Sequence, residues 1–360
     1  MIHLPARRLM LAVMLVGMLV FGYGCLPVPT EVRSPEADIS APGVFVLCEG
    51  LWRQDNSTLA FVGDDGAVVT DVVGTFNPGL RLGDTGTDLH VRGDSMWVVV
   101  STSRSIELFH RRTGRWLARL RFDDLREPYK MAFVNDSVAV CTFLNDNSIA
   151  EFNARTMSWR VARIDVGPAP EGIAVMNGLI YVANSGLGDL RSGEPLAGTV
   201  LVLSAVDLLP VDTIVGLINA MSVVPDPSTS TLWMTYRHLS STPDSLGGVV
   251  RYDPRTKAIT EHHRLRSPKG LVVDDRTGSA WLLHATGVDR LAGGERTLIM
   301  PRASSQNWYA LGFDARTGLL IIADARSYVT PGQVIIADTM GAVLRSHTVG
   351  INPGRIVVGN

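Results

Sequence analysis

The chain is built from short runs in which apolar and polar residues alternate, the period-2 pattern of half-buried β-strands. After residue 24, no run has the 3.6-residue periodicity of an amphipathic helix. One phrase recurs: an apolar-x-apolar strand start, a short turn and a second strand. Its first apolar residues are Leu89, Met131, Ile173, Met221, Leu271, Leu311 and Ile356, at intervals of 42, 42, 48, 50, 40 and 45 residues. This period predicts an all-β fold, a β-propeller with one repeat per blade.

Each repeat is expected to hold four strands, and seven strand starts predict seven blades. The last start, 355–358, has almost no chain after it. Three strand-like runs at the beginning of the chain, 44–47, 59–62 and 67–73, lack an inner strand of their own. The C-terminal strand is therefore expected to complete the blade that the N-terminal runs begin. Closing the ring in this way removes the long unpaired edges of an open sheet.

The N-terminus has the pattern of an export signal. Arg7 and Arg8 precede sixteen uncharged residues, 9–24, a length typical of a signal peptide and short for a membrane span. The small residues before Cys25 resemble a bacterial lipobox, in which cleavage leaves a lipid-carrying cysteine. A plain cleaved signal and a retained anchor helix remain alternatives. The expected domains are a signal peptide (1–24), a lipidated Cys25 with a proline-rich tether (25–42) and a propeller (43–360).

Charge and composition exclude several classes of function. Lys and Arg total 33 and Asp and Glu total 35, so the net charge of −2 argues against a basic nucleic-acid binder. Three cysteines cannot form a disulfide scaffold. Cys48 and Cys141 fall on second strands of non-adjacent blades and are expected to be buried free thiols. No cofactor, metal site or catalytic residue is predicted.

Four stretches carry a family resemblance: 44–52 with 56–59, Leu82-Gly83-Asp84, 170–175 (PEGIAV) and 181–186 (YVANSG). Over residues 43–360 the chain resembles the YVTN/YncE-like β-propellers. It is most similar to bacterial surface lipoproteins of that group whose first blade reads NEG-W followed by N-SL, although Cys48 stands where they usually have Asn. Some of these lipoproteins capture cobalamin beside TonB-dependent transporters. The resemblance therefore implies an exported, lipid-anchored protein of the outer membrane or cell surface that captures a corrinoid-like ligand.

A ligand site is expected on the top face, defined here as the face where innermost strands begin and second strands end. The repeat register places these entry residues there: Asp84, Tyr129, Lys130, Glu171, Asn219, Lys269, Trp308, Tyr309 and Arg355. The loops between second and third strands add Glu49, Trp52, Arg53, Arg104, Phe143, Asn145, Asn184, Tyr236, Arg237, His238, His284, Arg326 and Tyr328. Aromatic rings with polar handles, interspersed with arginines, suit a large, flat, partly polar molecule.

The predicted ligand-binding residues are Trp52, Arg53, Arg104, Tyr129, Phe143, Asn184, Tyr236, Arg237, Trp308, Tyr309, Arg326 and Tyr328. Two long loops, 184–198 and 236–248, lie on the same face and are expected to carry function or partner contacts. Two alternatives stay open. The first is a protein-interaction or structural propeller of the envelope. The second is a metal-dependent, lactonase-like hydrolase that would use the oxygens of Asp84, Glu171, Asn184 and Asn219.

Overall fold

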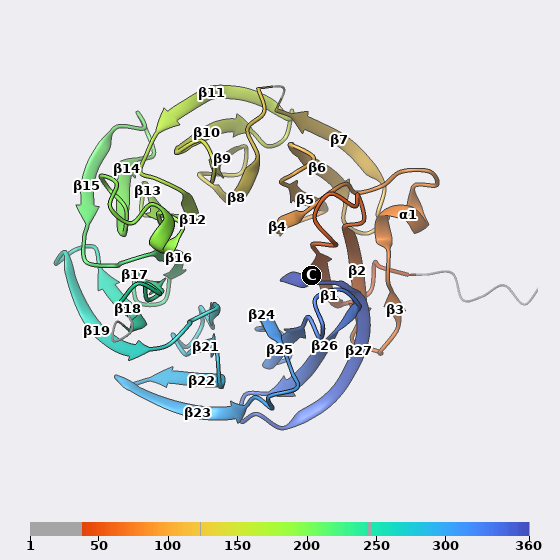
Figure 1. Cartoon of the computed structure of the whole chain (residues 1–360). Helices are drawn as coiled ribbons and strands as arrows, with labels where there is room; N and C mark the ends of the chain where they lie inside the picture. Colours follow the sequence, from red (N-terminus) through yellow and green to blue (C-terminus); the bar gives the residue numbers. More distant parts are fainter. Residues whose placement is uncertain (1–37, 123, 243–245, 360) are drawn as a thin grey trace, which may run out of the picture. The chain divides into compact units, whose positions relative to one another are not determined.

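The computed structural model describes residues 38–122, 124–242 and 246–359. The predicted signal peptide, Cys25 and most of the tether lie outside these residues. The described part forms seven four-stranded antiparallel sheets arranged in a ring (Figure 1), which confirms the predicted seven-bladed β-propeller. No helix among the described residues is long and apolar enough to cross a membrane.

Six blades are continuous in sequence, and each runs from the centre of the ring to its outside (Figure 1). Their strands are β4–β7 (Gly86–Arg92, Ser95–Val100, Ser105–His110, Trp116–Arg121), β8–β11 (Pro128–Phe133, Val138–Phe143, Ser148–Asn153, Ser158–Asp165), β12–β15 (Pro170–Met176, Leu179–Asn184, Thr199–Ser204, Pro210–Ile214), β16–β19 (Ala220–Asp226, Thr231–Tyr236, Gly247–Asp253, Ala258–Leu265), β20–β23 (Gly270–Val273, Ala280–His284, Gly287–Ala292, Glu295–Pro301) and β24–β27 (Trp308–Asp314, Leu319–Asp324, Pro331–Asp338, Val343–Ile351).

The seventh sheet, the closing blade, joins the two ends of the described chain in the order β28-β1-β2-β3. Its strands are β28 (Pro353–Gly359), β1 (Gly43–Cys48), β2 (Thr58–Gly63) and β3 (Val68–Val69). Val358 pairs with Val44, and Ile356 with Val46. The predicted closure by the C-terminal strand is therefore confirmed.

The outermost strand of the closing blade is shorter than predicted. After β3, Asp71 caps a five-residue helix, α1 (Val72–Phe76), by accepting a hydrogen bond from the backbone N–H of Gly74 at 3.1 Å. Val72 and Val73 are apolar and are buried in the structure. The sequence pattern of this run therefore resembled that of a strand. One turn of helix is too short to show a helical period, and the expectation of a strand over 67–73 is wrong for its second half.

The blade β16–β19 has a register offset by two residues from the predicted one. Val223 pairs with Met234, two positions before the end of β17, as Ile173 pairs with Val182 before the end of β13. Val223, and not Met221, is thus the counterpart of Ile173.

The core lies between neighbouring blades, where facing sheets pack their apolar side chains. One cluster joins Trp97 of β5 to Phe133, Phe143 and Phe152 of the next blade. Cys48 and Cys141 are both free and buried, as predicted. Burial raises the pKa of the Cys48 thiol to about 12, so this thiol is kept in its neutral form.

Candidate ligand site at the mouth of the central channel

The innermost strands of six blades carry a register shift at their top-face ends. The shift lies next to Asp88 in β4, Lys130 in β8, Glu171 in β12, Ser222 in β16, Tyr309 in β24 and Arg355 in β28. A bulge places an extra residue in one strand and re-aims its side chains. The shifts lie at equivalent places near the start of these six strands, each next to a polar side chain.

Asp88 connects three consecutive blades. Its carboxylate lies 3.1 Å from Nε of Arg355 in the closing blade and 3.0 Å from Nε2 of His90 in its own strand. It also accepts hydrogen bonds at 3.0 Å from the backbone N–H groups of Leu89 and, in the next blade, Met131. Burial alone would raise the pKa of Asp88, but the charges of His90, Arg355 and Lys130 hold it well below its usual range. Asp88 is therefore an ionised anchor.

Lys130 reaches back from β8 to the preceding blade. Its Nζ donates a hydrogen bond to the backbone carbonyl of Thr87 and lies 5.1 Å from the centre of the Tyr129 ring. Burial lowers the pKa of Lys130, while the negative charges of Asp88, Glu49 and Glu171 oppose that shift. These groups are close enough to influence each other's ionisation.

Two further glutamates, Glu49 and Glu171, lie near Lys130. The Tyr309 hydroxyl lies 3.1 and 3.0 Å from the two carboxylate oxygens of Glu49, to which it donates. Burial raises the pKa of Glu49, and burial likewise raises the pKa of Glu171, where Ser185, Arg237 and Lys130 oppose the shift. Both glutamates are thus biased toward the protonated form, in which a carboxyl group can also donate a hydrogen bond.

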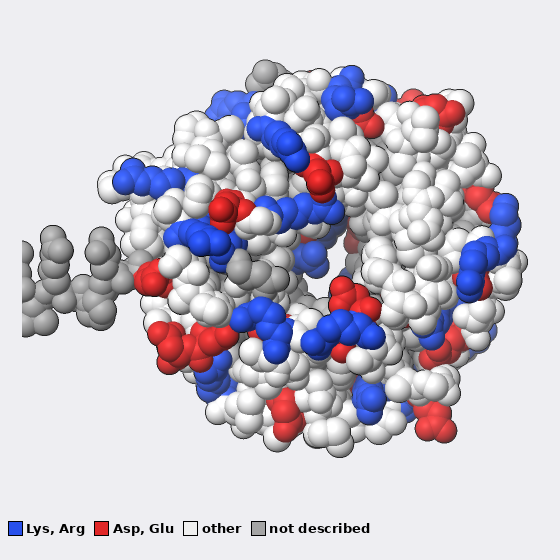
Figure 2. Space-filling model, turned by 180° about the vertical axis from the view of Figure 1, so that it is seen from behind, with Lys and Arg blue, Asp and Glu red and all other residues white. Residues whose placement is uncertain are grey.

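We call this set the channel cluster: Glu49, Asp88, Tyr129, Lys130, Glu171, Arg237, Tyr309 and Arg355. It draws on six of the seven blades. Figure 2, which views the molecule from the side opposite to Figure 1, shows that the ring is open at its centre. Three carboxyl groups, three cations and two phenols offer hydrogen-bond donors and acceptors to a ligand that carries both.

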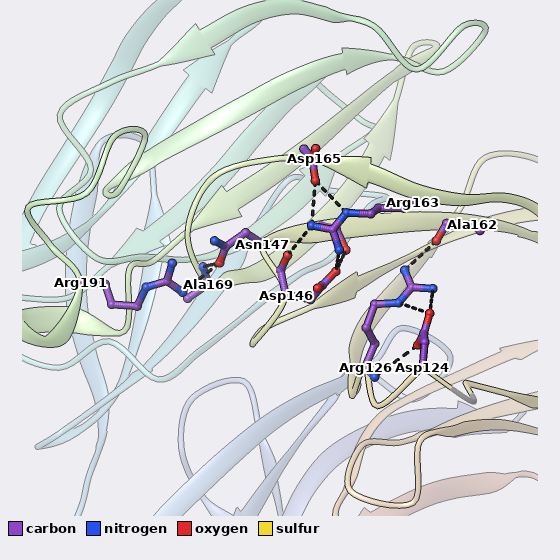
Figure 3. A network of polar contacts seen from close by, with 10 residues as sticks. Asp124, Arg126, Asp146, Asn147, Ala162, Arg163, Asp165, Ala169 and Arg191 are labelled. Carbon is purple, nitrogen blue, oxygen red and sulfur yellow. Dashed lines mark hydrogen bonds and ion pairs between the residues drawn. The ribbon is translucent and has the colours of Figure 1, made fainter.

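Polar contacts also join the loops beside this mouth. Figure 3 shows Asn147, whose side-chain oxygen accepts hydrogen bonds from Nη1 of Arg191 at 2.9 Å and from the backbone N–H of Ala169 at 3.3 Å, across the seam to the next blade. The two long loops contact each other, because Asp189 accepts hydrogen bonds from the backbone N–H groups of Ser240 and Ser241 at 2.7 and 2.9 Å. These contacts fix the loops relative to the ring.

Four predicted binding residues lie in the core and not on the surface. Trp308 is 1% exposed and packs between blades, and Phe143 and Tyr236 belong to other inter-blade clusters. Asn184 is buried and donates from Nδ2 to Thr199 Oγ1 at 3.3 Å. The expectation that these four side chains form an exposed rim is wrong, because neighbouring blades cover both faces of the second strands β9, β13 and β17 and bury the start of β24.

The other predicted residues lie at the surface or beside the mouth. Trp52 is 67% exposed and stacks under the guanidinium of Arg53, 4.2 Å from the ring centre. Tyr328 is 39% exposed and packs edge-on against Tyr309 of the channel cluster. Arg326 Nη2 donates to Gln333 Oε1 at 3.0 Å. Their role in ligand binding stays a prediction, as it does for Tyr129, Arg237 and Tyr309.

Sequence reasoning did not single out Asp88. The signal was present, since Asp88, Lys130 and Arg355 occupy equivalent positions of the repeated phrase and carry opposite charges. The proposed metal oxygens are partly engaged elsewhere: Asp84 accepts from Thr85 Oγ1 at 2.7 Å and from the backbone N–H of Asp55 at 3.2 Å. Within the described ranges, no group of three or more His, Cys, Asp or Glu side chains is arranged to hold a metal ion.

The fold and the channel cluster together define a seven-bladed β-propeller with a polar, partly aromatic mouth. No protein-family model matches the chain, and no curated protein matches it in sequence. Solved structures do match in fold.

One solved structure is a quinonprotein alcohol dehydrogenase-like protein from Bacteroides thetaiotaomicron, with a TM-score of 0.69 and 12% identity over 90% of this chain and 79% of that one. A functionally unknown protein from Desulfotomaculum acetoxidans has a TM-score of 0.63 and 15% identity over 88% of this chain and 99% of that one. Hydrazine synthase from Kuenenia stuttgartiensis has a TM-score of 0.57 and 14% identity, covering 72% and 85%. At such identities the likeness establishes the fold alone.

Proposed function

We propose that this protein is a lipid-anchored propeller of the bacterial envelope that binds a small ligand at the channel cluster, with a corrinoid as the leading candidate. The export pattern of residues 1–24 and Cys25 supports the anchor. The resemblance of the opening phrase to cobalamin-capturing surface lipoproteins supports the ligand class and a TonB-dependent transporter as partner.

The observation that carries the proposal is the concentration of ionisable groups at one end of the ring. Burying charges costs free energy even when they are paired. A structural ring could be closed by apolar side chains, yet here Asp88, Lys130, Glu49 and Glu171 all have shifted pKa values. Clusters of shifted groups in a concave place are typical of functional sites.

The chemistry of the cluster fits a ligand of mixed polarity. Tyr129, Tyr309 and Tyr328 supply flat contact area with a polar handle. Arg237 and Arg355 can pair with a phosphate or an amide oxygen. A corrinoid presents both kinds of surface, a flat macrocycle with amide side chains and a phosphate.

Calorimetry on the full-length protein tests this proposal. Cobalamin, haem and a neutral oligosaccharide are titrated separately, and we expect cobalamin to bind. Tyr309→Phe and Lys130→Met should each weaken binding about tenfold, the effect of losing one hydrogen bond to a charged or polar ligand group. Arg276→Ala on the opposite face, where Arg276 pairs with Asp274 at 3.1 Å, should leave binding unchanged.

If none of the three ligands binds more tightly than about millimolar, the small-molecule proposal fails. A protein partner docking on the top face would then be the better account. The exposure of Trp52 at a loop tip is the observation that favours this second candidate, because a solvent-exposed tryptophan is a common anchor of protein interfaces.

A further inference from the structure

A second polar site lies on the top face where the closing blade meets the blade β4–β7. A pocket of about 500 Å³ opens there. Its walls come from the segment that joins α1 to β4, from the loop between β5 and β6, and from the outermost strand β7. The side chains that line it include Asp55, Arg81, Ser103, Arg104, Arg119 and Arg121. No residue of the channel cluster lines this pocket.

The pocket carries a surplus of positive charge. Four guanidinium groups line it, against the carboxylate of Asp55 in the lining and that of Glu107, which pairs with Arg119. Arg81 and Asp55 approach to only 3.4 Å, and both side chains are mostly exposed, so this pair is weak. Arg119 uses Nε to contact Glu107 Oε1 at 2.5 Å, and its two terminal nitrogens have no further partner among the described residues.

Arg104 and Arg121 have neither an ion pair nor a side-chain hydrogen bond with any described residue. Arginines elsewhere in the molecule commonly hold an acidic partner, as Arg112 does with Asp94 at 2.9 Å and Arg255 with Asp253 at 3.0 Å. Like charges gathered in a concave site repel one another and attract an anion.

The backbone around Arg104 is fixed in an uncommon conformation. Arg104 has φ +55°, in the left-handed region that few side chains adopt. Its N–H donates to the Ser101 carbonyl at 2.8 Å, and its own carbonyl accepts from the N–H of Phe122 at 3.0 Å. Beside it, the Ser103 oxygen accepts the N–H of Asp84 at 2.8 Å, which leaves the Ser103 hydroxyl hydrogen available as a donor.

We infer that this pocket binds the phosphate group of a phosphorylated small molecule. The planar fork of arginine matches the oxygens of phosphate, and charge-assisted hydrogen bonds of this kind are the stronger ones. The volume accommodates a molecule of the size of a sugar phosphate. The inference goes beyond the proposed function, since the pocket and the channel cluster share no residue and either site can fail alone.

The test uses the full-length protein in phosphatidylcholine nanodiscs. Glucose 6-phosphate and glucose are titrated by calorimetry, and only the phosphate ester should bind, more weakly as salt is added. The double variant Arg104→Ala/Arg121→Ala should weaken that binding at least about tenfold, with an unchanged melting temperature. Arg115→Ala is the matched control, because Arg115 is an exposed arginine of the same blade at the opposite end of β7. It should bind as the wild type does.

Repeating the titration in discs that contain phosphatidylglycerol distinguishes the source of the phosphate. Competition by the lipid would assign the site to a membrane headgroup, and its absence would assign it to a soluble ester; both support a phosphate site. Equal binding of glucose, equal weakening by Arg115→Ala, or no binding of glucose 6-phosphate up to about 10 mM would each overturn the inference.

Discussion

At the scale of single residues, Asp88 is the point where three blades meet. Its carboxylate is 3% exposed, pairs with Arg355, contacts the His90 ring nitrogen and accepts hydrogen bonds from two backbone N–H groups. Replacing it with Asn keeps the shape but removes the charge that neutralises the surrounding cations. We expect Asp88→Asn to lower the free energy of unfolding by about 3 kcal/mol, the usual cost of leaving a buried charge unpaired. Urea titration at pH 7 measures this loss.

The control for Asp88→Asn is Asp94→Asn. Asp94 also pairs with an arginine, Arg112, but both side chains are more than half exposed. Exposed pairs contribute about 0–1 kcal/mol, so this variant should be nearly neutral. Equal losses in the two variants would contradict the anchoring role of Asp88.

Glu171 allows a prediction about pH. Burial raises its pKa above the ordinary value, so the folded state favours the protonated form. Its contribution to stability is full at low pH and is lost as the pH rises through the raised pKa. Glu171→Gln, which stays neutral, should therefore increase the melting temperature relative to wild type at pH 8 and by less at pH 4.

The exposed Glu295→Gln in β23 is the comparison for this experiment, and its melting temperature should follow wild type at both values. A gain for Glu171→Gln that is the same at pH 4 and pH 8 would show that the raised pKa is not the cause.

At the scale of elements, β28 is held by packing as well as by its ladder with β1. Ile356 belongs to a buried cluster that includes Ala310 and Ile321 of the neighbouring blade. Gly312 permits this approach, because a Cβ there would lie 2.7 Å from Ile356 Cγ2.

We expect Ile356→Ala to cost about 3 kcal/mol of unfolding free energy, since it leaves a cavity in a closed seam. The equivalent truncation of the 57% exposed Val343 in β27 should cost less than about 0.5 kcal/mol. Chemical denaturation of both variants makes the comparison. Similar losses would mean that the seam is not a determinant of stability.

The elements were predictable from sequence because alternation and repeat spacing are local signals. The residues of the candidate site were less predictable from sequence, and Trp308 and Tyr309 show the reason. They are adjacent in β24, yet Trp308 packs in the seam while Tyr309 reaches Glu49 at the channel. Period 2 says that they face opposite sides but not which side is which. The bulge between Trp308 and Ala310 interrupts the alternation of side chains between the two faces of β24. No residue type in this stretch indicates a bulge.

At the scale of the whole molecule, the number of blades and the closure followed from counting strand starts. The partnership of Asp88, Lys130 and Glu49 did not, because these residues are far apart in the chain and only the ring brings them together. The anchor remains a prediction from the N-terminal pattern.

Replacing Cys25 with Ser tests the anchor, because serine cannot carry the thioether-linked lipid. We expect the variant to move from the membrane fraction to the soluble fraction, with an unchanged melting temperature of the propeller. Cell fractionation followed by immunoblotting provides the measurement. Retention of Cys25→Ser in the membrane would indicate an uncleaved hydrophobic helix instead.

The pairing of β1 with both β28 and β2 has a mechanical consequence. The chain that precedes Gly43 enters the ring at an interior strand, hydrogen-bonded along both edges and buried at all six positions. A pull on that side of the chain would load two ladders in shear at once, whereas an edge strand could be peeled away one hydrogen bond at a time. The ring is therefore expected to resist unravelling when it is pulled from the N-terminal side of β1. Fluid drag on a protein held by a lipid at Cys25 would pull on this side.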